Sequence, residues 1–335
     1  MSSNLRTYLF FSLLAFACSA RSIAQDRFIH NMSSIPHFAN ASYFGFKDPT
    51  KIGIVSEFVS AQSSQVSQHQ YAFATSFFED YDFQLGLEYM NTKLDNSAYN
   101  SSLAKLSYIY KLEMENNWNV YPGISAGYTG YHFDFNSLVF SDQIDILTGQ
   151  VNTQTSDPIS AKENMGFVDL GASFMAHNNY NTSFGLSLRH INKPKISSEL
   201  SEQVFNMDML ISGQFAYEMS LNRYQQGLLP NYSYLYFYNV LSKQGPNSRL
   251  DLYQELTLAN LVLGVNQHVS GLNGFNLFQV GVSAGIKLET LDLGFNYSTP
   301  MGKGQLSTPN AFEIFIIFDL SPQKLRSRKD FSRFY

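Results

Sequence analysis

Residues 81–90 read YDFQLGLEYM, a stretch in which apolar and polar side chains alternate. Successive side chains of a β-strand point to opposite sides of the sheet, so this order gives each face one kind of residue. The stretch therefore predicts a strand that separates two different environments. Its apolar face carries Tyr81, Phe83, Leu85, Leu87 and Tyr89, and its polar face carries Asp82, Gln84, Gly86 and Glu88.

The same period of two continues along most of the chain. In residues 278–287 one face is apolar: Phe278, Val280, Val282, Ala284 and Ile286. A later strand is apolar at Leu291, Leu293, Phe295 and Tyr297, and the last one at Phe312, Ile314, Ile316 and Phe318. About 14 such segments are predicted: 51–60, 69–78, 81–91, 102–112, 117–133, 164–176, 180–191, 206–220, 229–241, 249–258, 260–269, 275–288, 290–298 and 310–320.

The lengths and connections of these segments are those of a membrane barrel. Several are near the roughly 9–11 residues that a tilted strand needs to cross the hydrocarbon layer. Tight connections at Glu79-Asp80, 177–179 and Glu289 contrast with longer ones at 134–163, 192–205 and 299–309. Outer-membrane barrels join their strands by short periplasmic turns and longer external loops. We therefore expect an all-β fold, a transmembrane antiparallel β-barrel of about 14 strands.

The composition agrees with this fold class and excludes others. The chain has 29 Phe and 21 Tyr, only 15% charged residues and a net charge of -5, which argues against nucleic acid as a partner. No run approaches the roughly 18 apolar residues of a spanning helix. The polar faces are rich in Gly, Ser, Ala and Asn, which favours a crowded or plugged interior. A soluble sandwich or barrel would alternate as well, but aromatic residues near segment ends (Tyr71, Phe77, Phe78, Tyr81, Tyr89 and Tyr297) suggest interfacial girdles.

The N-terminus has the pattern of an export signal. Arg6 precedes an apolar run at 8–17 that is too short to span a bilayer, and small residues favour cleavage after Ala24 or after Ala20. Cys18 leaves a lipoprotein signal as an alternative, although Ala15 stands where an aliphatic residue is usual. The predicted organisation is a signal peptide at 1–24, a pre-barrel segment at 25–50, the barrel at 51–320 and a basic tail at 321–335.

The basic tail carries Lys324, Arg326, Arg328, Lys329 and Arg333. It is interpreted as a solvated end, with a dock for anionic lipid or for a periplasmic partner as the alternative.

No motif predicts a catalytic, cofactor-binding or metal-binding residue. The seven histidines include no HxH or HExxH spacing. Acidic residues on inward faces offer paired carboxylates for acid–base chemistry, but a hydrated or salt-bridged lumen is the preferred interpretation. The acidic residues are Asp82, Glu88, Asp169, Asp208, Glu218, Asp251, Glu255 and Asp292, with Lys105, Arg189 and Lys287 as partners.

Four stretches resemble the PorP/SprF family of Bacteroidetes outer-membrane proteins. Residues 28–45 (FIHNMSSIPHFANASYFG) are similar to the family's opening, although 40–43 (NASY) lacks the proline of its Asn-Pro-Ala-Tyr-type motif. Residues 168–195 pair a strand with a tight turn and a second, Gly-containing strand that ends in a His-x-x-x-Pro-like corner. Residues 206–219 resemble a strand that is entered through an aromatic or Met-rich step. The closing strand begins Ala311-Phe312-Glu313-Ile314, but the family lacks this long basic tail.

The resemblance implies a role in type IX secretion and gliding. It implies an outer-membrane protein that helps to export, retain or anchor a secreted cargo such as a large adhesin, together with other secretion components and without catalysis. The alternatives are a channel or transporter for a small solute and a barrel-embedded hydrolase. Binding specificity would then lie in loops such as 134–163 and 192–205, because loops are free to vary.

Overall fold

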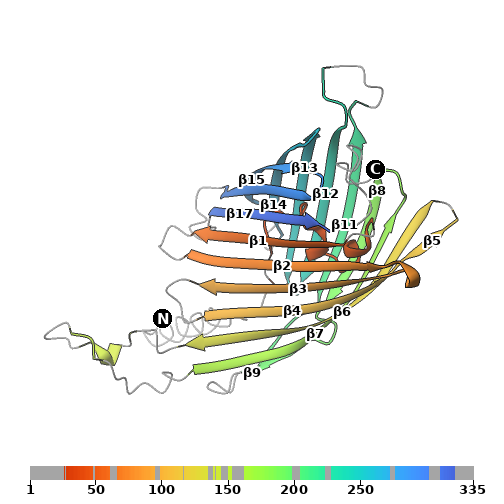
Figure 1. Ribbon diagram of the computed structural model, residues 1–335. Coiled ribbons are helices and arrows are strands. Elements are labelled where there is room, and N and C mark those ends of the chain that lie inside the picture. The colour runs from red at the N-terminus through yellow and green to blue at the C-terminus, as the bar shows by residue number, and fades with distance from the viewer. Residues whose placement is uncertain are drawn as a thin grey trace, which may run out of the picture.

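Fourteen antiparallel strands form a closed barrel in the computed structural model, in agreement with the expected fold and strand number. The first and last strands of the chain pair with each other, and the fourth and fifth strands of the ring pair directly, so the ring is continuous (Figure 1). The structure describes residues 26, 28–47, 50–60, 66–94, 99–115, 117–134, 139, 141–144, 150–152, 162–197, 204–222, 228–271, 276–301 and 310–320. The expected signal peptide and basic tail lie outside these residues.

The strand bounds follow the alternating segments closely. The ring strands are β1 (Lys51–Ser60), β2 (Val66–Phe78), β3 (Phe83–Leu94), β4 (Tyr99–Tyr110), β6 (Trp118–Asp134), β7 (Lys162–His177), β8 (Thr182–Arg189), β11 (Leu210–Ser220), β12 (Ser233–Gln244), β13 (Asn247–Leu258), β14 (Leu261–Ser270), β15 (Asn276–Lys287), β16 (Leu291–Pro300) and β17 (Asn310–Asp319). Three short strands lie outside the ring: β5 (Leu112–Met114) extends a turn, and β9 (Lys195–Ser197) pairs only with β10 (Val204–Asn206).

The two ends of the barrel differ. At the turn end, tight connections include the 3-10 turn η3 (Glu79–Tyr81) and the bend that joins β15 to β16. At the loop end, residues 135–161 join β6 to β7, and residues 190–209, which include β9 and β10, join β8 to β11. This is the asymmetry expected of an outer-membrane barrel.

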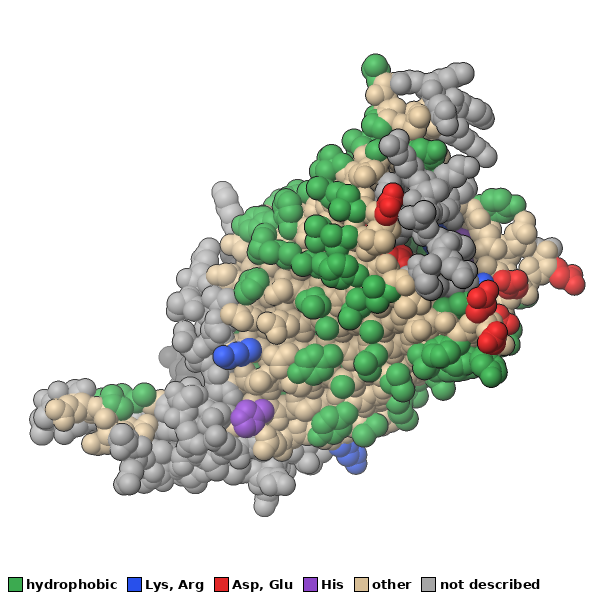
Figure 2. Space-filling model, viewed as in Figure 1, with side chains coloured by type: hydrophobic (Ala, Val, Ile, Leu, Met, Phe, Trp, Pro, Cys, Tyr) green, Lys and Arg blue, Asp and Glu red, His purple; other side chains and the backbone are tan. Residues whose placement is uncertain are grey.

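The outer wall is apolar, as the alternation predicts. Val282 is 54% exposed and Phe295 is 47% exposed, whereas the neighbouring Asn296 is fully buried on the inner face. Figure 2 shows hydrophobic side chains spread over the wall, with acidic side chains gathered toward one end. Such a wall suits lipid contact.

Three side chains depart from the predicted faces. A bulge between His268 and Val269 shifts the β14–β15 register, so Phe278 lies on the inside with its ring 6.1 Å from that of His268. Tyr71 is a buried inner residue that donates its hydroxyl to Glu88 at 2.7 Å, so it belongs to no girdle. Asp82 is exposed in the β2–β3 turn with a φ of 53°, outside the lumen.

Exposed aromatic side chains do gather at the turn end. Phe78 stacks on Phe83 with ring centroids 4.7 Å apart, and Phe83 lies 5.1 Å from Tyr108. On another part of the same rim, Phe184 lies 5.3 Å from Phe215. These rings form a girdle of the kind that marks a membrane–water interface.

Residues 28–46, hereafter the lumen segment, occupy the inside of the barrel (Figure 1). The segment precedes the barrel strands in sequence, and its side chains form the core together with inward residues of the strands. Its two 3-10 turns are η1 (Pro36–Phe38) and η2 (Ala41–Gly45). The ring of Phe44 lies over Gly86, where any Cβ would overlap it. The small side chains on the inner faces of the strands thus leave room for a chain segment.

Among the described residues, no helix is long and apolar enough to cross a membrane.

Arginine on the outer wall should be poorly tolerated. Val282→Arg places a charge on the lipid-facing side of β15, where the cost at the bilayer midplane is about 2–4 kcal/mol. We expect the folded, heat-modifiable fraction in outer membranes to fall sharply. Val282→Ala is the control and should fold nearly normally. Equal assembly of both variants would contradict the assigned face.

A candidate binding pocket above a filled lumen

The lower half of the lumen segment is attached to the wall by side chains of the NASY motif. Asn40 caps η2 by accepting from the Ser42 amide at 3.0 Å, and its amide nitrogen donates to Gln214 at 2.9 Å. The Ser42 hydroxyl bonds to Ser173 at 2.8 Å, and that of Tyr43 bonds to Ser183 at 3.1 Å. The motif therefore joins the segment to β7, β8 and β11.

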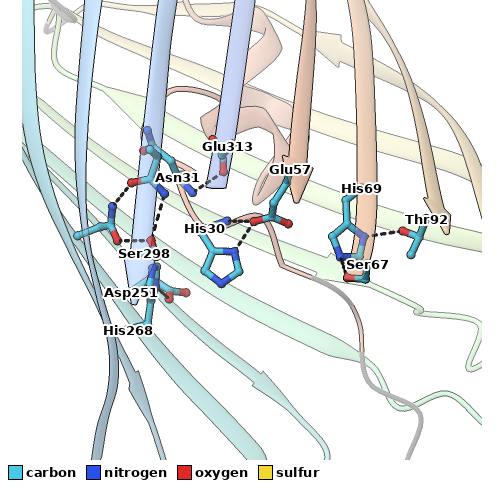
Figure 3. Close-up of polar contacts among 12 residues, drawn as sticks. His30, Asn31, Glu57, Ser67, His69, Thr92, Asp251, His268, Ser298 and Glu313 are labelled. Carbon is cyan, nitrogen blue, oxygen red and sulfur yellow. Dashed lines mark hydrogen bonds and ion pairs between the residues drawn. The ribbon is translucent and has the colours of Figure 1, made fainter. Parts of the chain in front are cut away.

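The upper half of the segment meets buried carboxylates at the seam between the first and last strands. Glu57 of β1 lies directly opposite Glu313 of β17, and both are buried. The His30 ring bonds to Glu57, and the backbone amide of Asn31 donates to Glu313 at 3.2 Å (Figure 3). Next along the segment, Ser33 donates to Glu255 at 2.5 Å. The segment thus supplies the partners that these carboxylates need in a low-dielectric interior.

A pocket of about 360 Å³ lies above the segment at the loop end. Its floor is charged, and most of its wall is aromatic or aliphatic. The short strand β9 contributes Ile196, which packs with Phe167 and Met207. The rest of the wall includes Phe38, Tyr99, Leu103, Tyr131, Phe133 and Met165.

The floor of the pocket is a network of four charged or titratable side chains. Asp26 accepts from Arg189 and from His190 Nε2, each at 2.9 Å, and Asp169 lies 2.9 Å from His190 Nδ1. Burial would raise the pKa of Asp26, but Arg189 and His190 together lower it from 3.8 to about 2. Burial opposes charge on His190, yet its bonds to Asp169 and Asp26 raise its pKa above 6.5. The network therefore favours the charged forms of Asp26 and His190.

This network should make stability depend on pH. The raised pKa of His190 stabilises the fold fully below 6.5, and the effect is lost as pH rises through the folded pKa. The lowered pKa of Asp26 stabilises the fold above 3.8, and that effect is lost as pH falls toward about 2. We therefore expect His190→Gln to lower the melting temperature in detergent more at about pH 5 than at about pH 9.

His132→Gln, at a histidine of β6 outside the network, is the control for this comparison. A deficit of His190→Gln that stays constant from acid to alkaline pH would exclude a titrating network.

Most of the predicted inward acids do face the lumen, and several are paired. Glu88 bonds to Lys105 at 2.7 Å, and Asp251 bonds to Arg249 at 2.6 Å and to His268 at 2.5 Å. Glu218 is buried, whereas Asp208 precedes β11 and Asp292 is half-buried. Among the described residues, no group of three His, Cys, Asp or Glu side chains is placed to hold a metal ion.

Sequence reasoning missed the partners that the lumen segment provides. Asp26, His30 and Asn31 were assigned to a pre-barrel segment, and only the small polar inner faces hinted that something fills the lumen. In the structure Asp26 lies 2.9 Å from Arg189, although the two residues are 163 positions apart in the sequence.

A closed ring of strands with an apolar wall, a girdle at the turn end and a filled lumen defines an outer-membrane β-barrel protein. The chain belongs to the family described as type IX secretion system membrane protein PorP/SprF, whose model matches residues 21–318. The resemblance noted in the sequence is thereby confirmed. No curated protein matches the chain.

Several solved structures are similar to the chain at low sequence identity. The Acinetobacter baumannii outer membrane protein Omp33 is 8% identical, with 82% of this chain and 100% of that chain covered and a TM-score of 0.44. CdiB from the same organism is 7% identical, covers 81% and 60%, and has a TM-score of 0.45. The KdgM porin is 9% identical, covers 80% and 98%, and has a TM-score of 0.36.

Proposed function

We propose that this protein retains or helps to export a secreted cargo protein at the cell surface, as a binding component of type IX secretion that performs no chemical step. The cargo would be a large surface protein such as an adhesin, held at the loop end of the barrel. Membership of a family of type IX secretion membrane proteins supports a role in that system. Outer-membrane lipid and the other secretion components would be its remaining partners.

The filled lumen is the observation that favours binding over transport. Residues 28–46 bring apolar and polar side chains into the core of the barrel and bond to strands on several sides. A segment packed in this way leaves little room for a solute path, whereas the pocket of about 360 Å³ lies at the outer mouth. Ligand pockets begin at about 300 Å³, so this volume suits recognition.

Deletion of the gene tests the proposal directly. We expect one large surface protein to disappear from the cell envelope and to accumulate in the medium or inside the cell. The same protein should co-purify with the tagged barrel from detergent extracts. An unchanged surface proteome combined with altered solute uptake would overturn the anchoring role and favour a channel.

A further inference from the structure

The floor of the loop-end pocket already holds a carboxylate, which is the side chain of Asp26. Asp26 precedes the lumen segment, and its two 2.9 Å contacts are to Arg189 and His190, which follow each other at the end of β8. The backbone amide of Asp26 also donates to Gln244 at 2.8 Å. The wall thus presents two adjacent cationic donors aimed at one acidic group.

One donor is held independently of Asp26, and the other has a nitrogen to spare. His190 is held from its other ring nitrogen and from its backbone amide by Asp169, at 2.9 and 3.0 Å. The Nε of Arg189 is buried and has no hydrogen-bond partner among the described residues. A second carboxylate could therefore replace Asp26 and keep both cations paired. Such an exchange avoids the cost of leaving a buried charge uncompensated.

The apolar wall adds a second requirement for a ligand. Tyr131 and Phe167 face each other with centroids 6.1 Å apart, and Tyr99 and Phe133 lie 5.3 Å apart beside them. Together with Leu103 they line the space above the charged floor. Aromatic side chains of this kind bind other large apolar groups through area and ring contacts. The pocket therefore joins a carboxylate site to an apolar site.

We propose that this pocket binds a peptide carboxylate that stands next to a large apolar side chain, and that Asp26 is its built-in competitor. The proposal rests on the anchoring function above, since it names the chemistry by which a cargo segment would be held. The carboxylate belongs either to a chain terminus or to an acidic side chain. In both cases it takes the place of Asp26 on Arg189 and His190.

Binding of short peptides to the full-length barrel in detergent tests the chemistry by calorimetry. The probes are N-acetyl-Phe-Gly with a free terminal carboxylate, N-acetyl-Phe-Asp-amide with a side-chain carboxylate, and N-acetyl-Phe-Gly-amide with neither. At least one acidic probe should bind about tenfold more tightly than the amide. The stronger of the two acidic probes identifies the source of the carboxylate. Equal binding of all three, or no binding, overturns the proposal.

Asp26→Asn separates competition from a merely structural role. Removing the internal carboxylate should tighten binding of the acidic probe by about tenfold or more, whereas a structural role predicts weaker binding. Tyr131→Ala should weaken the binding of all probes. Asp251→Asn is the matched control, because Asp251 pairs with an arginine and a histidine outside the pocket. Asp251→Asn should leave probe binding unchanged. If the Asp26→Asn barrel bound the acidic probe more weakly than the wild type does, the competition would be contradicted.

Cell experiments distinguish this inference from the anchoring function itself. If gene deletion releases a surface protein but Tyr131→Ala and Arg189→Gln barrels, present at normal levels, still retain it, the pocket proposal fails and anchoring stands. If acidic peptides bind as expected but deletion releases no protein, anchoring fails and the pocket remains a binding site. Release by both pocket variants supports the two together.

Discussion

Deletion of residues 26–46 is expected to turn a silent barrel into a conducting one. The wild-type protein should give no steady current steps in planar bilayers, because the lumen segment packs against inward side chains of many strands. Barrels of about 16–18 strands enclose water-filled channels, and those of about eight are filled by their own side chains. With 14 strands, this barrel needs the additional segment to be closed.

The deletion also removes buried apolar side chains, so a lower yield of folded protein is expected. Ile29, Met32, Ile35 and Phe44 are each at most 1% exposed. The measurement should therefore count only inserted, heat-modifiable barrels. Deletion of the tail at 321–335 is the control and should remain silent. Folded barrels that lack residues 26–46 and still conduct nothing would show that the segment is not what closes the lumen.

A cysteine pair tests whether the segment must leave the lumen in use. Ser42 and Ser173 have their hydroxyl oxygens 2.8 Å apart, one on the segment and one on β7. An oxidised Ser42→Cys, Ser173→Cys barrel holds the segment in place. If the protein acts as an anchor, the locked barrel should retain its cargo as well as the wild type does. Loss of retention on oxidation, reversed by a reductant, would instead indicate a moving segment.

The barrel itself was predictable because its signal is local and repeated. Each strand alternates between lipid-facing and inward residues, so Leu293 and Asn296 can be assigned to faces without knowledge of the fold. Errors arise where the backbone interrupts the period. The bulge opposite His268 turns the side chain of Phe278 to the inner face. The turn at Asp82 places that residue outside the strand predicted for it.

The contents of the lumen were not predictable in the same way. Residues 28–46 have no regular period, since they form short 3-10 helices and turns rather than an α-helix or a strand. Their contacts join residues far apart in sequence, such as Asn31 with Glu313 and Ser33 with Glu255. Long-range pairing of this kind leaves no local pattern. Glu88 was recognised as inward with Lys105 as a partner, but the buried Glu57 and Glu313 and the contacts that the lumen segment makes with them were not.

Replacing His30 by alanine is expected to destabilise the barrel strongly at its closing seam. The substitution removes the imidazole that bonds to Glu57, which lies directly opposite Glu313 in the β1–β17 register. Breaking a buried pair by removing one partner costs about 3–5 kcal/mol, because the remaining charge is uncompensated. We expect the urea midpoint of the purified barrel to fall accordingly. His132→Ala, outside this seam, should change stability by no more than about 0.5 kcal/mol.

A second substitution distinguishes lost charge compensation from lost packing. In the double variant His30→Ala, Glu57→Gln, the seam no longer holds an unpaired carboxylate from β1, so most of the stability should return. The remaining deficit would be that of the cavity left by the imidazole. If the double variant were no more stable than His30→Ala alone, packing rather than charge would explain the loss. Recovery would mean that His30 of the lumen segment stabilises the closing seam by compensating the charge of Glu57, which couples barrel closure to filling of the lumen.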